Sequence, residues 1–123
     1  MKHQLWCKDN NEWEKDEWLI TPDGKPYDLQ RRTCYRPDTH ILVTGIEIHN
    51  KIYFAGDILK CNLDDMLFEV EPENGNWVAN NYRITSNGYK FISSWIELQY
   101  IGSIYENIGN KYENPDLLKY EGE

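Results

Sequence analysis

The chain has 123 residues, a net charge of -8 and an isoelectric point of about 4.8. That charge argues against a general binder of the nucleic-acid backbone, which needs Lys and Arg to displace counterions, and hydrophobic residues at 40% argue against global disorder. Five Trp and nine Tyr favour a β-rich fold, because aromatic rings suit a half-buried pleated sheet, although they also suit an exposed protein-binding surface.

The first third of the chain is predicted to form a strand and a hairpin. Residues 4–7 (QLWC) are typical of a short strand, and the Asp-Asn-Asn run at 9–11 ends it. A second strand is expected at 18–21, followed by a turn at 22–25 (PDGK) and a returning strand at 26–29.

The polar stretch 30–39 (QRRTCYRPDT) is interpreted as an exposed loop or a linker. We therefore expect an N-terminal strand and hairpin region over residues 1–39. A barrel-like core with a C-terminal docking segment is expected over residues 40–123. One single domain over residues 1–123 is the alternative, and the length of the chain also fits it.

The core region is expected to open with two strands and a hairpin. Residues 40–44 are predicted to form a strand that ends at Gly45, and the alternation at 46–49 (IEIH) is typical of a half-buried strand. A hairpin tip is expected at 50–51, before a further strand at 52–54.

Gly56 lies inside the apolar run 52–61 and indicates a bulge or a sharp bend, such as a small barrel uses to turn a corner. Asp57 follows it, and two roles are open for this carboxylate. It could act as an acid/base or metal ligand, or it could accept backbone N–H groups and fix the corner. We favour the structural role, because general acid–base work needs a positioned partner.

Further strands are predicted at 66–70 and 77–84, separated by a loop at 71–76. Asn87-Gly88 is the strongest hairpin signal in the chain and is expected to lead into a strand at 89–92. Another strand is expected at 95–100. Many short strands joined by turns predict a mainly β barrel or sandwich, with one short helical turn at 116–120 after Asn114 and Pro115.

One heptad is written twice, at 101–107 (IGSIYEN) and 108–114 (IGNKYEN). A coiled coil is rejected, because glycines and asparagines lie inside the helix that it would require. A shift of seven residues also sends the second tyrosine to the opposite face of any straight strand. We predict a buried strand at 101–105, a turn or bulge at 107–110, and a more exposed second copy.

The cysteines and histidines show no metal-binding or disulfide pattern. The cysteines are odd in number and form no CxxC pair, and the histidines are scattered. No apolar signal segment or membrane span is visible, so the expected compartment is a reducing cytoplasm, and no metal or cofactor is expected. The residues concerned are Cys7, Cys34, Cys61, His3, His40 and His49.

No catalytic residues are assigned, because the chain has no phosphate-binding glycine loop, nucleophile elbow or HExxH motif. The segment 25–36 (KPYDLQRRTCYR) is the candidate interaction site, since basic side chains alternate there with aromatic rings. It can be a solvated face, a protein contact, or a nucleic-acid site in which bases stack on the rings. The residues proposed for it are Tyr27, Arg31, Arg32, Tyr35 and Arg36.

Three motifs resemble the YopX-like family of phage and prophage proteins. They are LWCKDNNEW at 5–13, TGIEIHNKIYFAGDILKC at 44–61, and the tail that ends in YENPDLL at 112–118. Phe54-Ala55 departs from the Tyr-Glu that the family places before Gly-Asp, so any role of that acidic position is absent here. The residues that carry the resemblance are Trp6, Gly45, Tyr53, Gly56, Asp57, Ile101, Gly102, Ile104, Tyr105, Tyr112, Glu113, Asn114, Pro115, Leu117 and Leu118.

The resemblance implies a small SH3-like or partly open β-barrel with a small N-terminal β extension, and it supplies no catalytic residues. It also implies a phage or prophage accessory protein in the host bacterial cytoplasm. We expect a non-catalytic module that binds protein or assembles with itself as a homo-oligomer, with a host or phage protein as the other partner. The alternatives are a nucleic-acid-associated factor that uses residues 25–36, and a small hydrolase or nuclease.

Overall fold

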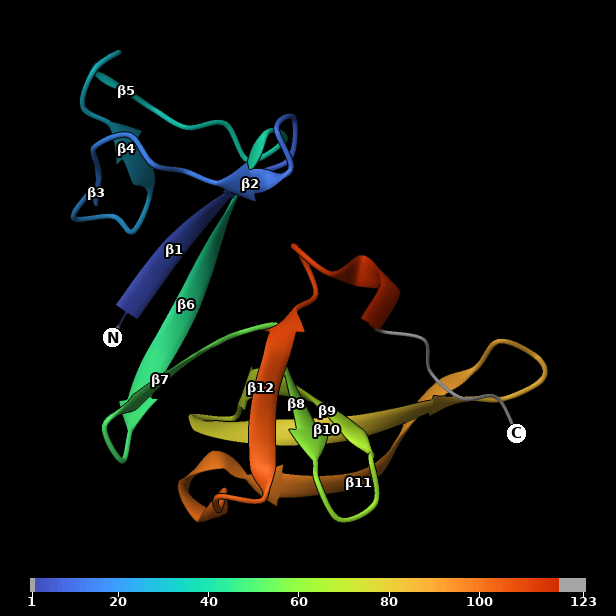
Figure 1. Ribbon diagram of the computed structural model, residues 1–123. Coiled ribbons are helices and arrows are strands. Elements are labelled where there is room, and N and C mark those ends of the chain that lie inside the picture. The colour runs from blue at the N-terminus through green and yellow to red at the C-terminus, as the bar shows by residue number, and fades with distance from the viewer. Residues whose placement is uncertain (1, 118–123) are drawn as a thin grey trace.

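The computed structural model describes residues 2–117, and these form antiparallel sheets with two short 3-10 helices (Figure 1). The first sheet has the order β2 (Glu12–Trp13), β1 (Lys2–Cys7), β6 (His40–Ile48), β7 (Lys51–Phe54). The second has the order β11 (Lys90–Glu97), β10 (Asn76–Ile84), β9 (Leu67–Glu73), β8 (Asp57–Cys61), β12 (Tyr105–Asn110). The third contains β3 (Trp18–Ile20), β4 (Pro26–Asp28) and β5 (Thr33–Cys34).

The five-stranded sheet curls around the main core, which confirms the prediction of a mainly β, barrel-like fold. Alternate residues of its strands face inward, as the period of two requires, and Tyr53 of β7 and Leu98 pack against them. Leu98 begins the 3-10 helix η1 (Leu98–Tyr100). The inward set from the sheet is Leu59, Cys61, Phe68, Val70 and Ala79.

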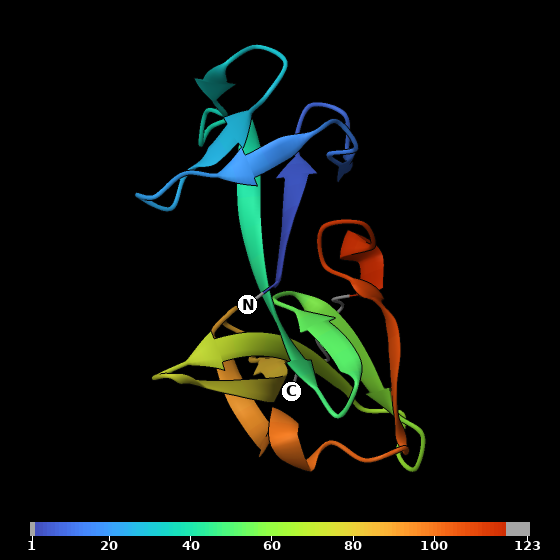
Figure 2. The same ribbon diagram turned by 90° about the vertical axis from the view of Figure 1, so that its left-hand side faces the viewer.

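The long strand β6 joins the two ends of the molecule. Figure 2 shows the antiparallel strands β1 and β6 side by side between the small three-stranded sheet and the curled sheet. Residues of β1 pair with β6 from Lys2↔Gly45 to Cys7↔His40, so one sheet spans the predicted boundary at residue 39. The division into two domains stays a prediction. Among the described residues, no helix has the length and apolar composition to cross a membrane.

Gly56 forms the corner that the sequence predicts. The chain leaves the four-stranded sheet at Phe54 and enters the five-stranded sheet at Asp57, and Gly56 between them has φ +91°. Such a φ favours glycine. The Gly56 N–H donates to the Val70 carbonyl (2.8 Å), which fastens the corner to β9.

Gly45 has a different role from the predicted one. It does not end a strand, because β6 continues to Ile48 and Gly45 pairs with Phe54 of β7. A Cβ on Gly45 would lie 2.6 Å from Cδ1 of Phe54 and 2.8 Å from the Tyr53 carbonyl oxygen. The glycine is therefore required by close packing inside a continuous strand.

Gly45→Ala is expected to lower the free energy of unfolding by about 2 kcal/mol, because the ring of Phe54 and the backbone of Tyr53 must both move to admit a methyl group. Urea denaturation measures the change. Gly102→Ala is the control, since a Cβ there meets no atom within 4 Å, and it should change stability by less than about 0.5 kcal/mol. Equal effects of the two substitutions would contradict this account.

Hairpin positions were predicted with mixed success. The Asn87-Gly88 hairpin is confirmed, since Ile84 pairs with Lys90 across it. The tip of the β6–β7 hairpin lies at His49-Asn50, one residue earlier than expected, and both residues have positive φ. The predicted loop at 71–76 is wrong, because β9 runs to Glu73 and turns at Asn74-Gly75.

The doubled heptad forms one strand across the junction of its copies. The predicted strand at 101–105 is wrong: residues 101–104 lie outside regular structure and β12 covers Tyr105–Asn110. The predicted irregularity at 107–110 is confirmed as a register shift between Asn107 and Gly109. The second copy is the more buried one, contrary to prediction, because its side chains reach the buried carboxylates of Asp57 and Glu69.

The end of the described chain is partly as predicted. The strand expected at 95–100 is replaced by the end of β11 at Glu97 and by η1. A second 3-10 helix, η2 (Pro115–Leu117), follows Asn114, whose side chain accepts the Asn110 N–H (3.3 Å). The rest of the turn expected at 116–120 lies outside the described residues.

Candidate functional site

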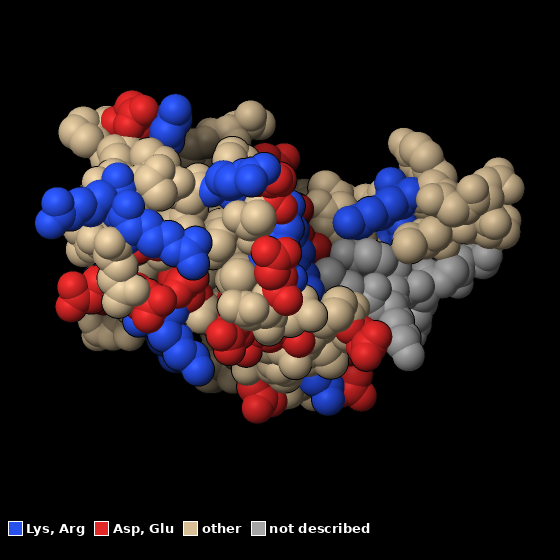
Figure 3. Space-filling view, turned by 90° about the horizontal axis from the view of Figure 1, so that it is seen from above, with Lys and Arg blue, Asp and Glu red and all other residues tan. Residues whose placement is uncertain are grey.

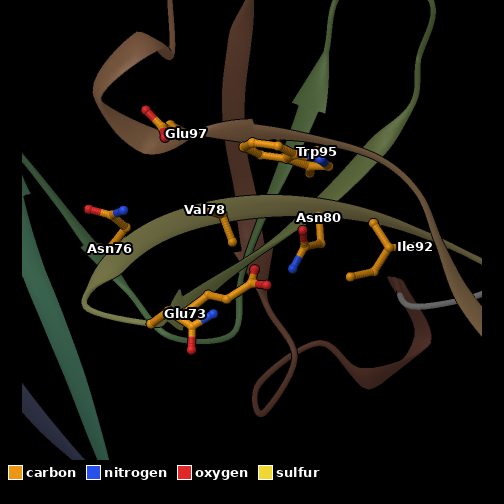
Figure 4. Close-up of a pocket in the computed structure, with 8 residues that line it drawn as sticks. Glu73, Asn76, Val78, Asn80, Ile92, Trp95 and Glu97 are labelled. Carbon is orange, nitrogen blue, oxygen red and sulfur yellow. The ribbon is translucent and has the colours of Figure 1, made fainter.

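A groove of about 450 Å³ lies on the side of the five-stranded sheet that faces away from the core, where β9, β10 and β11 run side by side (Figure 4). We refer to it as the sheet groove. Its apolar residues are Val78, Ile92 and Trp95, and the others are Glu73, Asn74, Asn76, Asn80 and Glu97.

An exposed aromatic wall forms one side of the sheet groove. Trp95 is 61% exposed, whereas the other four tryptophans, all of them described, are at least half-buried. Ile92 is also exposed. Trp95 and Ile92 are three residues apart, so they would lie on opposite faces of a regular strand. The register shift after Asn81 turns both to one face.

The floor of the sheet groove is polar. Asn80 lies directly opposite Trp95 in the β10–β11 register and is 3% exposed. Its Nδ2 donates to Oε2 of Glu71 (2.6 Å), and the hydroxyl of Tyr82 donates to the same oxygen. Burial, and then this carboxylate, raise the pKa of Tyr82, which keeps the phenol a donor at neutral pH. Oδ1 of Asn80 has no hydrogen-bond partner among the described residues.

Carboxylates dominate the charge of the sheet groove. Figure 4 shows the side chain of Glu73 extending toward Val78 and Asn80, and its carboxylate makes no hydrogen bond or ion pair with any described residue. Glu97 accepts a hydrogen bond from Nε2 of Gln99 (2.7 Å). None of the described residues that line the groove is a Lys or Arg. An acidic groove beside an exposed indole suits a cationic group.

The predicted interaction segment 25–36 lies elsewhere, at the β3–β5 end of the molecule. Arg31, Tyr35 and Arg36 line a second pocket, of about 480 Å³, whereas Tyr27 and Arg32 are not part of its wall. We refer to it as the N-terminal pocket. Its arginines have local acidic partners: Nε of Arg31 lies 3.8 Å from Oδ2 of Asp28, and Nη2 of Arg36 lies 2.8 Å from Oδ2 of Asp38.

Basic and acidic side chains are intermixed over this end of the molecule, and no continuous basic surface is visible there (Figure 3). One face of the Tyr35 ring already packs on His40, with centroids 4.4 Å apart. Burial, and then the charges of Glu14, Asp28 and Asp16, raise the pKa of Tyr35 to about 12. The solvated-face, protein-contact and nucleic-acid interpretations of this segment stay predictions.

The residues that carry the family resemblance gather at two structural contacts. Trp6 and Tyr112 form an aromatic cluster with Trp13, and the indole N–H of Trp13 donates to Glu113. This cluster attaches the tail to β1 and β2. At the other contact, Asp57 accepts hydrogen bonds from Nδ2 of Asn107 and Asn110 and from the backbone N–H of Phe54 in β7.

The other residues that carry the resemblance line neither the sheet groove nor the N-terminal pocket. Ile101, Gly102 and Ile104 precede β12, and Tyr105 packs edge-on against Phe68 of the core (5.6 Å between centroids). Pro115 and Leu117 belong to η2. Leu118 lies outside the described residues.

No protein-family model and no curated protein matches the chain. A solved structure does: the crystal structure of the YopX protein from Bacillus subtilis superposes with a TM-score of 0.57 over 95% of this chain and 97% of that one. The fold is that of YopX. Identity is 17%, so the YopX-like resemblance predicted from the three motifs is confirmed at the level of the fold.

The sheet groove was not predicted from the sequence, because its residues belong to different strands and come together only through the pairing of β9, β10 and β11. Trp95 was assigned only to a predicted strand, and nothing in its neighbours signals exposure. The register shift that turns Ile92 and Trp95 to the same face depends on pairing with β10, which local sequence patterns do not encode.

Proposed function

We propose that this chain is a phage or prophage accessory protein of the host cytoplasm that acts without catalysis, as a module that binds a basic, extended segment of another protein. The phage setting rests on the YopX-like fold and motifs. The binding role rests on one observation, the exposed Trp95 beside the carboxylates of the sheet groove.

A Lys or Arg side chain matches the chemistry of the sheet groove. Its charge is attracted by Glu73 and Glu97 and by the face of the Trp95 ring. The net charge of -8 adds long-range attraction for a basic partner.

An extended backbone matches the edge beside the sheet groove. β11 is the last strand in the order of its sheet, so its outer edge pairs with no described strand. A partner segment can add to such an edge through main-chain hydrogen bonds and place alternate side chains over Trp95. A second copy of the chain is the alternative occupant, but it would bring its own excess of carboxylates to an acidic face.

Extended octapeptides with a central Arg or Lys should bind, and peptides with norleucine at that position should bind at least about tenfold more weakly. Isothermal titration calorimetry measures both. Trp95→Ala and Glu73→Gln should each weaken binding of the Arg peptide, because each removes one attraction for the cation.

Two variants serve as matched controls. Tyr100→Ala removes an exposed ring outside the groove, and Glu106→Gln removes an exposed carboxylate on β12. Both should leave binding unchanged. Absence of peptide binding, or equal losses in the control variants, would refute the proposal; concentration-dependent dimerisation abolished by Trp95→Ala would assign the groove to a second copy.

A further inference from the structure

Three metal-ligating side chains meet at one end of the four-stranded sheet. Cys7 is the last residue of β1, His40 is the first residue of β6, and Glu14 directly follows β2. Sγ of Cys7, a ring nitrogen of His40 and a carboxylate oxygen of Glu14 all lie within 4.8 Å of one another. In sequence these residues show no metal-binding spacing, and the sheet alone brings them together.

The backbone holds the three residues in place. Cys7 and His40 are directly opposite each other in the antiparallel β1–β6 pair, so their side chains leave the same face at close range. The N–H of Glu14 donates to the Leu5 carbonyl (2.7 Å), which keeps the chain after β2 alongside β1. Cys7 and His40 therefore belong to the sheet, and a backbone hydrogen bond holds Glu14 beside it.

The two ring nitrogens of His40 face different partners, Nδ1 toward Thr39 and Nε2 toward Glu14. Nδ1 lies 2.9 Å from the hydroxyl oxygen of Thr39, and that hydroxyl lies 3.1 Å from the Arg36 carbonyl. Where the hydroxyl donates its one proton to that carbonyl, it accepts from Nδ1. In that arrangement Nε2 carries a lone pair, the arrangement that outer partners give to metal-bound histidines.

That nitrogen faces a carboxylate. Nε2 of His40 lies 3.3 Å from Oε2 of Glu14, and a lone pair beside a carboxylate oxygen needs a cation between or next to them. Oε1 of Glu14 accepts the Asp16 N–H (3.3 Å), which orients the carboxylate. A proton on Nε2 would meet this need, and so would a metal ion.

The third ligand decides between a proton and a metal. Cys7 is 4% exposed and its thiol lies in the same cluster. A proton on His40 would not involve this thiol, whereas a thiolate is a strong zinc ligand. We propose that Cys7, Glu14 and His40 bind one zinc ion. The cluster lies in the wall of the N-terminal pocket, so the fourth ligand of the tetrahedral ion comes from solvent or from a small molecule in that pocket.

The full-length chain, reduced and stripped of metal, should bind one equivalent of Co²⁺ with an ultraviolet thiolate-to-metal charge-transfer band, and Zn²⁺ should displace it. Cys7→Ser should abolish the band, and Glu14→Gln and His40→Gln should each weaken Co²⁺ binding at least about tenfold. Thr39→Val should weaken it about tenfold, since it removes only the partner of Nδ1.

Cys34→Ser is the matched control, because Cys34 is an exposed cysteine in the wall of the same pocket but outside the cluster. It should keep the band. Far-ultraviolet circular dichroism of each metal-free variant shows whether it folds; Glu14→Gln and Thr39→Val change half-buried positions and test the site even if Cys7→Ser unfolds. A chain without the band, or a band lost in Cys34→Ser and kept in Cys7→Ser, would overturn the proposal and leave the cluster as a His40–Glu14 contact beside a buried thiol.

Discussion

Asp57→Ala is expected to lower the free energy of unfolding by about 3 kcal/mol. Asp57 is 7% exposed and accepts three hydrogen bonds, from the Phe54 N–H (2.8 Å), from Nδ2 of Asn107 (3.1 Å) and from Nδ2 of Asn110 (2.9 Å). The alanine variant leaves these donors without their acceptor, and a buried donor in that state costs about 1–3 kcal/mol. The loss should appear as a lower urea midpoint.

An exposed aspartate provides the comparison. Asp38→Ala removes a carboxylate that pairs with Arg36 at the surface, and surface pairs of this kind contribute about 0–1 kcal/mol. If Asp57→Ala were no more destabilising than Asp38→Ala, the corner at Gly56 would not depend on the carboxylate, and the structural role assigned to Asp57 would be wrong.

The pH dependence separates the charge of Asp57 from its hydrogen bonds. Burial raises the pKa of Asp57, hydrogen bonds from Phe54, Asn110 and Asn107 lower it, and the net direction is upward from 3.8. A raised pKa means that the stability linked to this group is fully present below pH 3.8 and is lost as pH rises through the folded-state pKa. The Asn side chain cannot ionise, so wild type should lose stability relative to Asp57→Asn over that rise. A difference that is constant with pH would contradict the raised pKa.

Turn chemistry made much of the fold predictable from sequence, because it acts over a few residues. The sequence correctly predicted turns at Pro-Asp-Gly-Lys and Asn87-Gly88 and a corner at Gly56. These turns also indicated where the neighbouring strands begin and end. The error at 71–76 has a physical origin. Pro72 lies inside β9 and not in a loop: β8 pairs with β9 only as far as Glu69, so Pro72 lies where β9 has a single neighbour and its missing N–H is tolerated.

Long-range contacts made the candidate sites unpredictable. The role of Gly45 is set by the ring of Phe54 across the hairpin, the face of Trp95 is set by a register shift, and Cys7 meets His40 only because β1 pairs with β6. Each depends on which strands become neighbours. The local sequence pattern indicates that a strand forms, but it does not determine which other strand pairs with it.

The doubled heptad shows how a small difference in sequence is used. The copies differ at two positions, where Ser103 and Ile104 of the first become Asn110 and Lys111 of the second. Both altered residues reach buried carboxylates: Asn110 bonds to Asp57, and Nζ of Lys111 lies 3.3 Å from Oε2 of Glu69. The two substitutions therefore give the second copy these contacts, whereas the identical tyrosines Tyr105 and Tyr112 differ because one begins β12 and the other follows it.

Lys111→Met is expected to lower the free energy of unfolding by about 2 kcal/mol at neutral pH. Glu69 is 4% exposed, and removing one partner of a buried ion pair leaves the charge of the other poorly compensated. Burial lowers the pKa of Lys111, the Glu69 carboxylate raises it, and the net direction is upward, so the ammonium is charged at neutral pH. Lys111 is partly exposed, and solvent screening keeps the expected value below that of a fully buried pair.

A double-mutant cycle with Glu69→Gln isolates the pair. Glu69→Gln alone should cost less than Lys111→Met, because the freed ammonium can turn toward water, and the double variant should recover part of the loss, with a coupling energy of about 1 kcal/mol or more. Lys60→Met is the control, since Lys60 pairs with the exposed Asp65 and should change stability by less than about 0.5 kcal/mol. Additive losses in the cycle would show that Lys111 stabilises the fold through its contacts with Gly56 and Tyr112. The change from isoleucine to lysine in the second heptad would then serve packing and not charge.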